Sequence, residues 1–339
     1  EHGAKVQQSA VAVDMSPLDF AESNAARFVE AWKGLDINYD FFMRTSDARH
    51  EAVVAKVLQK IYDRGFIYKG EYSGLYCVGC EKFLQNDDVV DGHCPLHPNQ
   101  TPVENKEENY FFKLSAFRDK LLAAIEQGDY KIIPEGRKNE VVGKLKQGLE
   151  DISISRAGVT WGIPVPWDNA QTIYVWVDAL FNYYSATQFL EGRQDFWPAD
   201  VHLLAKDILW FHALVWESLL LANKIELPKA IFAHGFFTVD GQKMSKTLGN
   251  IIDPVDLVKE YGSDATRYLL ISSFSFGNDG DISLEKFKEK YNSDLANGVG
   301  NLVARIAKLC ETSGFDNTNI PTNEFSPEVV KFMDQYRPD

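Results

Sequence analysis

The chain has 339 residues, of which 45% are hydrophobic and 13% aromatic, a composition that excludes disorder as the main state. At roughly 100 to 200 residues per domain, this length predicts two or three domains. Asp and Glu outnumber Lys and Arg by 49 to 35, giving a formal net charge of -14, which argues against a protein that coats nucleic acid non-specifically. The most apolar stretch, residues 203–222, is interrupted by Lys206, Asp207, His212 and Glu217, so no membrane-spanning segment is expected.

The first 65 residues alternate helical and strand-like patterns. Either residue of Ser23-Asn24 is expected to cap a helix that ends near Lys33. Residues 40–45, which include three consecutive apolar side chains, predict a short buried strand. Ser46-Asp47 is expected to cap the next helix, residues 50–64, whose apolar side chains share one face. A strand flanked by helices is typical of an α/β domain.

Composition changes at Phe66, where short β-prone segments separated by turn residues begin. We expect strands at residues 66–68, 74–77 and 110–114, then helices at 115–126 and 137–148 and a strand at 152–156. This part of the chain is interpreted as a small module inserted into the α/β domain.

The α/β pattern then resumes, which predicts one doubly wound domain interrupted by the insertion. Strands are expected at residues 172–177, 201–204 and 230–234, with helices at 179–189 and 208–223. After Asn250 the pattern is helical, at residues 254–261, 263–271, 284–291 and 293–311.

Two short cysteine motifs indicate a metal site. Cys77 and Cys80 are separated by two residues, and thirteen residues separate Cys80 from the second motif, Cys94-Pro-Leu-His97. Two such turns supply four ligands to a tetrahedral zinc ion, with no open position for a substrate, so the ion would be structural. His93 is an alternative fourth ligand, and scattered buried cysteines are the other interpretation. Metal ligation favours a reducing compartment, the cytoplasm or an organellar matrix.

A glycine-flanked loop carries two lysines three positions apart, Lys243 and Lys246. Such a pair could form a mobile positive clamp that neutralises a departing pyrophosphate. A solvated basic turn is the alternative interpretation. The full string is more specific, because Lys243–Thr247 resembles the K-M-S-K-S signature of the class I aminoacyl-tRNA synthetases, with threonine at the last position.

Two further segments, residues 174–183 and 206–216, resemble the pocket segments of the methionyl-tRNA synthetase family. The resemblance extends to residues 107–112, 152–156, 161–164 and 301–302, and so covers nearly the whole chain. A soft thioether packs well against aromatic rings, although without the resemblance these aromatic stripes would be interpreted as ordinary core.

The resemblance implies roles for individual residues. The methionine-binding residues would be Trp176, Ala179, Tyr183, Ile208, Phe211, His212 and Trp216. The ATP-binding residues would be Lys206, Asp207, His234, Gly235, Lys243, Met244, Ser245 and Lys246. Catalysis would involve Lys243, Lys246 and Arg156, and the tRNA anticodon would be read by Asn301 and Arg305. Leu180 and Ala205 depart from the proline and glycine common in the family.

The resemblance also implies the fold, which is α/β: a partial class I Rossmann-like nucleotide-binding domain, an inserted zinc-binding connective module and a partial C-terminal α-helical bundle. Residues 1–65 would be the remainder of the first Rossmann half, 66–156 the insertion and 157–250 the second half with the lysine loop. Residues 251–290 would be a linking helical segment, and 291–339 the start of the anticodon-binding domain.

The implied function is methionine–tRNA ligase activity, with methionine, ATP with Mg²⁺ and tRNA(Met) as partners, one structural zinc ion and no membrane. The other class I signature, H-I-G-H, does not occur in the sequence, so the chain is expected to lack an N-terminal segment and to be inactive by itself. The related valine, isoleucine and leucine enzymes need an editing insertion larger than residues 66–156. A non-catalytic zinc-ribbon module that binds RNA is the alternative from a different functional class.

Overall fold

The computed structural model describes residues 1–78, 82–84, 89, 92–95, 98, 101–244 and 250–313. The chain divides into two compact units, one spanning Glu1–Ile282 and the other beginning at Ser283. Each unit is described by itself below.

Three helices open the first unit: α1 (Ala4–Val11), α2 (Pro17–Gly34) and α3 (Ala48–Asp63). The predicted start of α2 at Ser23-Asn24 is wrong, because the helix begins at Pro17, where the Ser16 side chain accepts a hydrogen bond from the backbone N–H of Asp19. The predicted cap of α3 is confirmed, since the Asp47 carboxylate accepts from the N–H of Arg49.

Residues 41–44 form no strand, so the strand predicted at residues 40–45 is wrong. Their aromatic side chains pack against other aromatic rings instead. The Phe42 ring meets Trp32 of α2 with centroids 5.3 Å apart, and Phe41 meets Phe189 at 6.0 Å. A short apolar run is therefore satisfied here by aromatic contacts rather than by a neighbouring strand.

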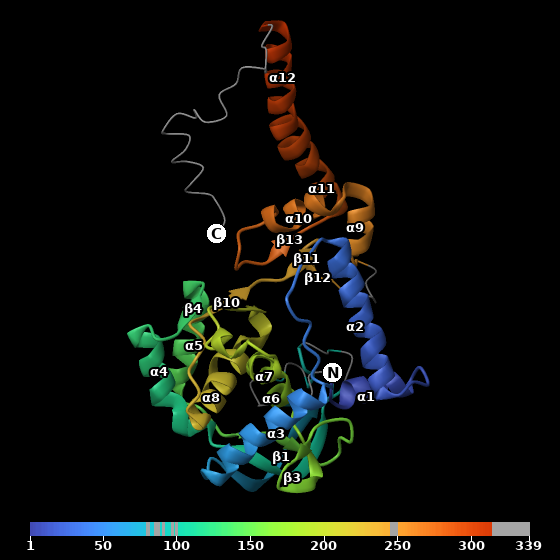
Figure 1. The fold of residues 1–339 in the computed structure, drawn as a ribbon. Coiled ribbons are helices and arrows are strands. Elements are labelled where there is room, and N and C mark those ends of the chain that lie inside the picture. Colours follow the sequence, from blue (N-terminus) through green and yellow to red (C-terminus); the bar gives the residue numbers. More distant parts are fainter. Residues whose placement is uncertain are drawn as a thin grey trace. The chain divides into compact units, whose positions relative to one another are not determined.

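A four-stranded antiparallel sheet in the order β2-β1-β3-β5 follows α3. Its strands are β1 (Ile67–Cys77), β2 (Lys82–Leu84), β3 (Val103–Phe112) and β5 (Ile152–Ser153). The long pairing of β1 with β3 runs from Ile67 opposite Phe112 to Tyr76 opposite Val103 (Figure 1). The separate short strands predicted at 66–68 and 74–77 are thus parts of one strand.

A parallel sheet in the order β4-β10-β9 contributes Ile132, Leu204 and Ile231 to the main apolar core. Its strands are β4 (Lys131–Ile133), β10 (Ala230–His234) and β9 (His202–Ala205). The middle strand carries the fully buried Ile231 and Ala233, as expected for a parallel strand covered on both faces. Strand β4 was not predicted from the sequence. It lies between the helices α4 (Arg118–Gln127) and α5 (Glu135–Gln147), which Figure 1 shows beside it.

A second antiparallel sheet, β6-β8-β7, leads into the helices of the predicted pocket. Its strands are Ser155–Arg156, Asp168–Ile173 and Pro164–Val165, in that order. The strand predicted at residues 172–177 is wrong in its second half, because Val175 begins α6 (Val175–Leu180). Helix α7 (Asn182–Phe189) follows after a single residue.

The helix predicted at residues 208–223 exists, but its first part is wound differently. A 3₁₀ turn, η4 (Lys206–Ile208), precedes a π-helix, η5 (Phe211–Trp216), which continues as α8 (Glu217–Asn223). Helix α8 packs against α3, and η5 packs against α6. Trp216 has no exposed surface and is the largest fully buried side chain in the described structure.

Glu217 is fully buried beside η5, and neither of its carboxylate oxygens has a hydrogen-bond partner among the described residues. Burial therefore raises the pKa of Glu217 well above its usual value, which favours the neutral carboxyl group in the folded protein. Because the unfolded chain ionises above about pH 4.3, the stability of the fold should decrease as the pH rises above that value.

The variant Glu217→Gln should consequently be more stable than the parent at pH 7 to 8 and equally stable near pH 4. Thermal unfolding measured across this pH range checks the prediction, with the exposed Glu126→Gln of α4 as the matched control. A stability difference between Glu217→Gln and the parent that does not change with pH would contradict it.

The lysine loop starts from a hairpin made by β11 (Phe237–Val239) and β12 (Gln242–Lys243). Asp240 and Gly241 at its turn both have positive φ, 53° and 70°, as a type I′ turn requires. Strand β13 (Gly280–Asp281) pairs with β11 in parallel. Between them lie α9 (Pro254–Tyr261) and α10 (Ser263–Ser272), close to the predicted ranges.

The described residues of the second unit, 283–313, are helical, as predicted. They form α11 (Leu284–Lys290), the π-helix η6 (Tyr291–Gly300) and α12 (Asn301–Ser313). Among all described helices, none combines the length and the apolar character that a membrane crossing requires.

Candidate active site

The two aromatic segments predicted to line one pocket are in contact. The Trp176 ring of α6 stacks on the Phe211 ring of η5, with centroids 4.6 Å apart and planes 4° from parallel. The Tyr183 ring of α7 meets the edge of His212 at 5.2 Å. The structure thus brings together residues that lie about 30 positions apart in the sequence.

Burial of these side chains increases from one end of the cluster to the other. Trp176, Ala179, Tyr183, Ile208 and Phe211 are half-buried. His212 and Trp216 are completely buried, and Phe181 packs edge-on against Trp216 with centroids 4.9 Å apart. The first group can therefore contact a ligand while the second forms a rigid base, which is the arrangement expected of an apolar side-chain pocket.

A buried polar network lies directly behind α6 and was not predicted from the sequence. The Asp178 carboxylate accepts hydrogen bonds from His2 Nδ1 at 2.6 Å and from His50 Nε2 at 2.7 Å. His50 Nδ1 is 2.7 Å from the Ser185 hydroxyl. Asp178 belongs to the pocket segment that resembles the family, and this position in the motif was the only signal that could have indicated it.

The two histidines keep Asp178 ionised although only 1% of the residue is exposed. Burial by itself raises the pKa of Asp178. The hydrogen bonds from His2 and His50 lower it by more than burial raises it, so the pKa of Asp178 is below its usual value. The network ties α6 to α3 and to the N-terminal segment, so it fixes the helix that carries Trp176 and Ala179.

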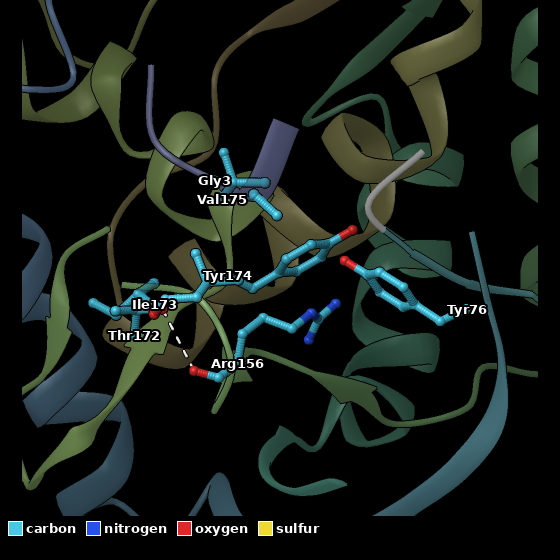
Figure 2. Close-up of a pocket in the computed structure, with 9 residues that line it drawn as sticks. Gly3, Tyr76, Arg156, Thr172, Ile173, Tyr174 and Val175 are labelled. Atoms are coloured by element: carbon cyan, nitrogen blue, oxygen red, sulfur yellow. Dashed lines mark hydrogen bonds between the residues drawn. The ribbon is translucent and has the colours of Figure 1, made fainter. Parts of the chain in front are cut away.

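Arg156 is buried rather than exposed at a strand end. Its guanidinium carbon lies 3.9 Å from the centre of the Tyr174 ring, and its Nη1 donates to the Ser155 carbonyl at 2.7 Å. Figure 2 shows Arg156 beneath Tyr174 and beside Tyr76. Arg156, Gly3 and Val175 are among the residues that line a cavity of about 10 Å³ there. Arg156 therefore lies next to the first residue of α6.

Four of the ATP-site residues predicted from the resemblance lie at the carboxyl ends of two adjacent parallel strands. Strand β9 leads into Lys206 and Asp207, and β10 ends at His234, before Gly235. A Cβ atom on Gly235 would lie 2.1 Å from the carbonyl oxygen of Asn278, so only glycine fits there. Ligands of open α/β sheets bind at this edge.

Two lysines converge on the ring of Phe236, a residue not predicted for the site. Lys206 Nζ lies 5.3 Å from the ring centre and Lys243 Nζ 5.5 Å from it. Lys206 also forms an ion pair with Asp279 at 2.6 Å, and this hydrogen bond lowers the pKa of the Asp279 carboxyl group. The backbone N–H of Phe236 donates to the same carboxylate, so Asp279 links β9 to the lysine hairpin.

An open pocket of about 440 Å³ lies beside the hairpin. Four residues predicted for the ATP site line it: His234, Gly235, Lys243 and Met244. The remaining lining is apolar and comes from the start of β11 and the residue before it, and from α10 and the residues after it: Phe236, Phe237, Leu270, Ile271, Phe274 and Phe276.

Some predicted site residues lie outside the described residues: Ser245, Lys246, Cys80 and His97. The other two cysteines of the predicted zinc site, Cys77 and Cys94, are buried in one small cluster with Leu84. Within the described part of the chain, no group of three or more metal-binding side chains occurs. Asn301 and Arg305 are exposed on α12 of the second unit.

Comparison with known proteins identifies the family. The family model described as tRNA synthetases class I (M) matches residues 1–102 and 96–307. The chain belongs to the class I tRNA synthetases (M). The resemblance stated from the lysine signature and the pocket segments is therefore confirmed, and so is the class I α/β fold.

This class I synthetase chain is similar to methionine–tRNA ligases of several bacteria. A methionine–tRNA ligase of Caldanaerobacter subterraneus subsp. tengcongensis is 46% identical over 316 residues, which are 92% of this chain and 49% of the relative. One of Synechocystis is 43% identical, covering 93% of this chain and 61% of the relative. The chain thus spans about half to three fifths of the length of these relatives.

A solved structure shares the fold. The Mycobacterium tuberculosis methionyl-tRNA synthetase in complex with methionyl-adenylate superimposes with a TM-score of 0.89 at 39% identity, covering 98% of this chain and 67% of that chain.

Proposed function

We propose that this chain is part of a methionine–tRNA ligase and carries its methionine pocket and one side of its ATP site. The observation that carries the proposal is the contact between the two aromatic segments, Trp176 on Phe211 and Tyr183 on His212. This cluster lies next to the strand β9, whose carboxyl end leads into Lys206. Strand β9 thereby connects the apolar side-chain pocket to the edge of the parallel sheet where the phosphates would bind.

In this reaction, the carboxylate of methionine attacks the α-phosphorus of ATP, a new P–O bond forms and pyrophosphate leaves. The methionyl group of the resulting methionyl-adenylate then passes to a ribose hydroxyl at the 3′ end of tRNA(Met), and AMP leaves. No side-chain nucleophile is needed, because positioning and charge stabilisation lower the barrier. Lys243 and Lys246 would stabilise the departing pyrophosphate, and Lys206, Asp207, His234, Gly235, Met244 and Ser245 would bind the rest of ATP.

Two further roles belong to this proposal. Arg156, held under Tyr174 beside the start of α6, would assist activation by offering a fixed positive charge. Asn301 and Arg305, both exposed on α12, would read the anticodon.

The test is methionine-dependent exchange of labelled pyrophosphate into ATP, measured on the full-length protein and on residues 1–339 alone. We expect exchange only with methionine among the amino acids, and only in the full-length protein. RNA binding without any exchange in the full-length protein would favour the zinc-ribbon RNA-binding module instead.

A structural zinc ion is part of the proposal. Cys77 and Cys94 share one buried cluster, and thiolates are soft ligands suited to zinc. Together with Cys80 and His97 they would hold a tetrahedral ion that stabilises the connective module, whose own apolar cluster is small. The ion would take no part in the reaction.

The variant Cys94→Ser should lose the zinc, because three remaining ligands hold the ion much more weakly. Atomic absorption of the purified protein measures the metal content, with Cys310→Ser in α12 as the control that keeps it. One zinc ion per chain in Cys94→Ser would contradict this ligand set. Loss of zinc in His93→Ala but not in His97→Ala would identify His93 as the fourth ligand.

A further inference from the structure

The carboxylate of Asp279 connects two parts of the proposed ATP site. Its Oδ2 accepts a hydrogen bond from Lys206 Nζ at 2.6 Å, and its Oδ1 accepts one from the backbone N–H of Phe236 at 2.9 Å. Lys206 directly follows strand β9, whereas Phe236 directly precedes β11 of the lysine hairpin. One carboxylate therefore fixes the ammonium group of Lys206 relative to the hairpin that carries Lys243.

The segment that carries Asp279 is held against the hairpin by its own backbone. The Gly280 N–H donates to the Phe236 carbonyl at 2.8 Å, and the Ile282 N–H donates to the Thr238 carbonyl at 2.8 Å. These hydrogen bonds do not involve the Asp279 side chain. A substitution that removes only the charge of this side chain should therefore leave the segment and the hairpin in place.

The carboxylate also balances charge where two cations converge. Lys206 Nζ and Lys243 Nζ lie 5.3 and 5.5 Å from the centre of the same ring, that of Phe236, and like charges at such short range repel each other. The hydrogen bonds from Lys206 and from the Phe236 N–H lower the pKa of Asp279, so its carboxyl group is ionised at neutral pH and offsets this repulsion.

The ion pair leaves Lys206 able to bind a second anion. An ammonium group has three donors, and the Asp279 carboxylate takes one of them. Two donors thus remain for phosphate oxygens while the side chain is held in one orientation. A lysine that is already oriented loses less conformational entropy when its ligand binds.

We propose that Asp279 is a positioning residue for methionine activation, which holds the ammonium group of Lys206 in place for the phosphates of ATP. The inference rests on the proposed function and deepens it. A charge that is oriented before the reaction stabilises the transition state without reorganisation as pyrophosphate leaves. Asp279 acts through Lys206 and does not itself contact ATP.

The test is a double-mutant cycle on the full-length protein, made of Asp279→Asn, Lys206→Ala and the double variant. Asparagine keeps an acceptor oxygen for the Phe236 N–H but has no charge for Lys206. Asp279→Asn should form methionyl-adenylate about tenfold more slowly in a single turnover, a factor that corresponds to about 1.4 kcal/mol. In the Lys206→Ala background, the same substitution should change the rate by less than about twofold, because no ammonium group remains to be positioned.

The matched control is Asp200→Asn. Asp200 pairs with Lys229 Nζ at the same distance, 2.6 Å, but these two residues precede β9 and β10 and so lie at the opposite edge of the parallel sheet. Its rate should equal that of the parent. Thermal unfolding of Asp279→Asn should also stay close to that of the parent, since a partly exposed ion pair contributes little to stability.

Three results would overturn the proposal. An equal decrease in rate on replacing Asp279 in both backgrounds would identify a role that does not depend on Lys206. An undiminished rate in Lys206→Ala would do the same. A rate of Asp279→Asn equal to or above the parent rate would show that the carboxylate does not prepare Lys206 for the phosphates. Asp279→Ser, which also keeps an acceptor oxygen without the charge, replaces Asp279→Asn in the cycle if that variant fails to fold.

The outcome for the proposed function is separate. If the full-length parent forms no methionyl-adenylate, the proposed function is wrong and the inference is wrong with it. If the parent forms methionyl-adenylate and the cycle shows no coupling between Asp279 and Lys206, only the inference is wrong.

Discussion

Asp178→Ala should unfold at a much lower denaturant concentration than the parent protein, with a loss of about 3–5 kcal/mol in the free energy of unfolding. This is the usual cost of removing one partner from a buried charged pair. The substitution leaves His2 and His50 without the carboxylate that both contact. Urea unfolding at pH 7 measures the loss, and the exposed Asp195→Ala is the control, expected to change stability by less than about 0.5 kcal/mol.

The pH dependence of this loss follows from the lowered pKa of Asp178. The stabilisation is fully present above the pKa of the unfolded carboxyl group, about 3.9. It is lost as the pH falls through the lower pKa of the folded protein. Parent and Asp178→Ala should therefore converge in stability only in strong acid. Asp178→Asn, which retains one acceptor oxygen, should lie between them at pH 7. Equal stability of Asp178→Ala and the parent at pH 7 would show that the network does not stabilise the fold.

The rate of methionine activation should decrease by about two to three orders of magnitude in Lys246→Ala, the size found when one preorganised charge donor is removed from a transition state. Methionine affinity should change little, because the lysine acts on the phosphates. Single-turnover formation of methionyl-adenylate in the full-length protein measures the rate, and equilibrium binding measures the affinity.

The matched control is Lys60→Ala, which removes an exposed lysine of α3 and should leave the rate unchanged. A Lys246→Ala variant that loses affinity for ATP but keeps its maximal rate would assign this lysine to ground-state binding. Lys243→Ala should resemble Lys246→Ala, with the further loss of the cation that lies over Phe236.

Local sequence signals predicted many helices correctly because their causes are local. Asp253 before Pro254 supplies a side-chain cap and a proline in the first turn, and α9 begins there as expected. The same holds for Asp47 and α3. The start of α2 was predicted wrongly because two possible N-cap sites lie close together. The helix begins at Ser16-Pro17, while the side chains of Ser23 and Asn24 donate hydrogen bonds to the backbone carbonyl of Phe20.

The secondary structure of short apolar runs was ambiguous, because an apolar sequence does not specify which part of the protein will cover it. Residues 41–43 are satisfied by aromatic rings rather than by a strand. Val175 and Val177 favour a strand by propensity, yet they lie in α6, where helix packing against η5 outweighs that preference. The π-helical winding of η5 likewise has no signal in the spacing of its apolar residues.

Contiguous motifs were visible in the sequence by itself: the lysine signature and the two aromatic segments, which indicated the family, and the paired cysteines, which predict a zinc site. Only the tertiary structure decided which polar groups meet inside the protein. Asp178 is 176 residues from His2 and 128 from His50, and His202 reaches His212 across the turn between β9 and η5. Such pairs produce no periodic pattern in the sequence. A buried polar group requires a partner with the right geometry, and that partner can lie at any distance along the chain.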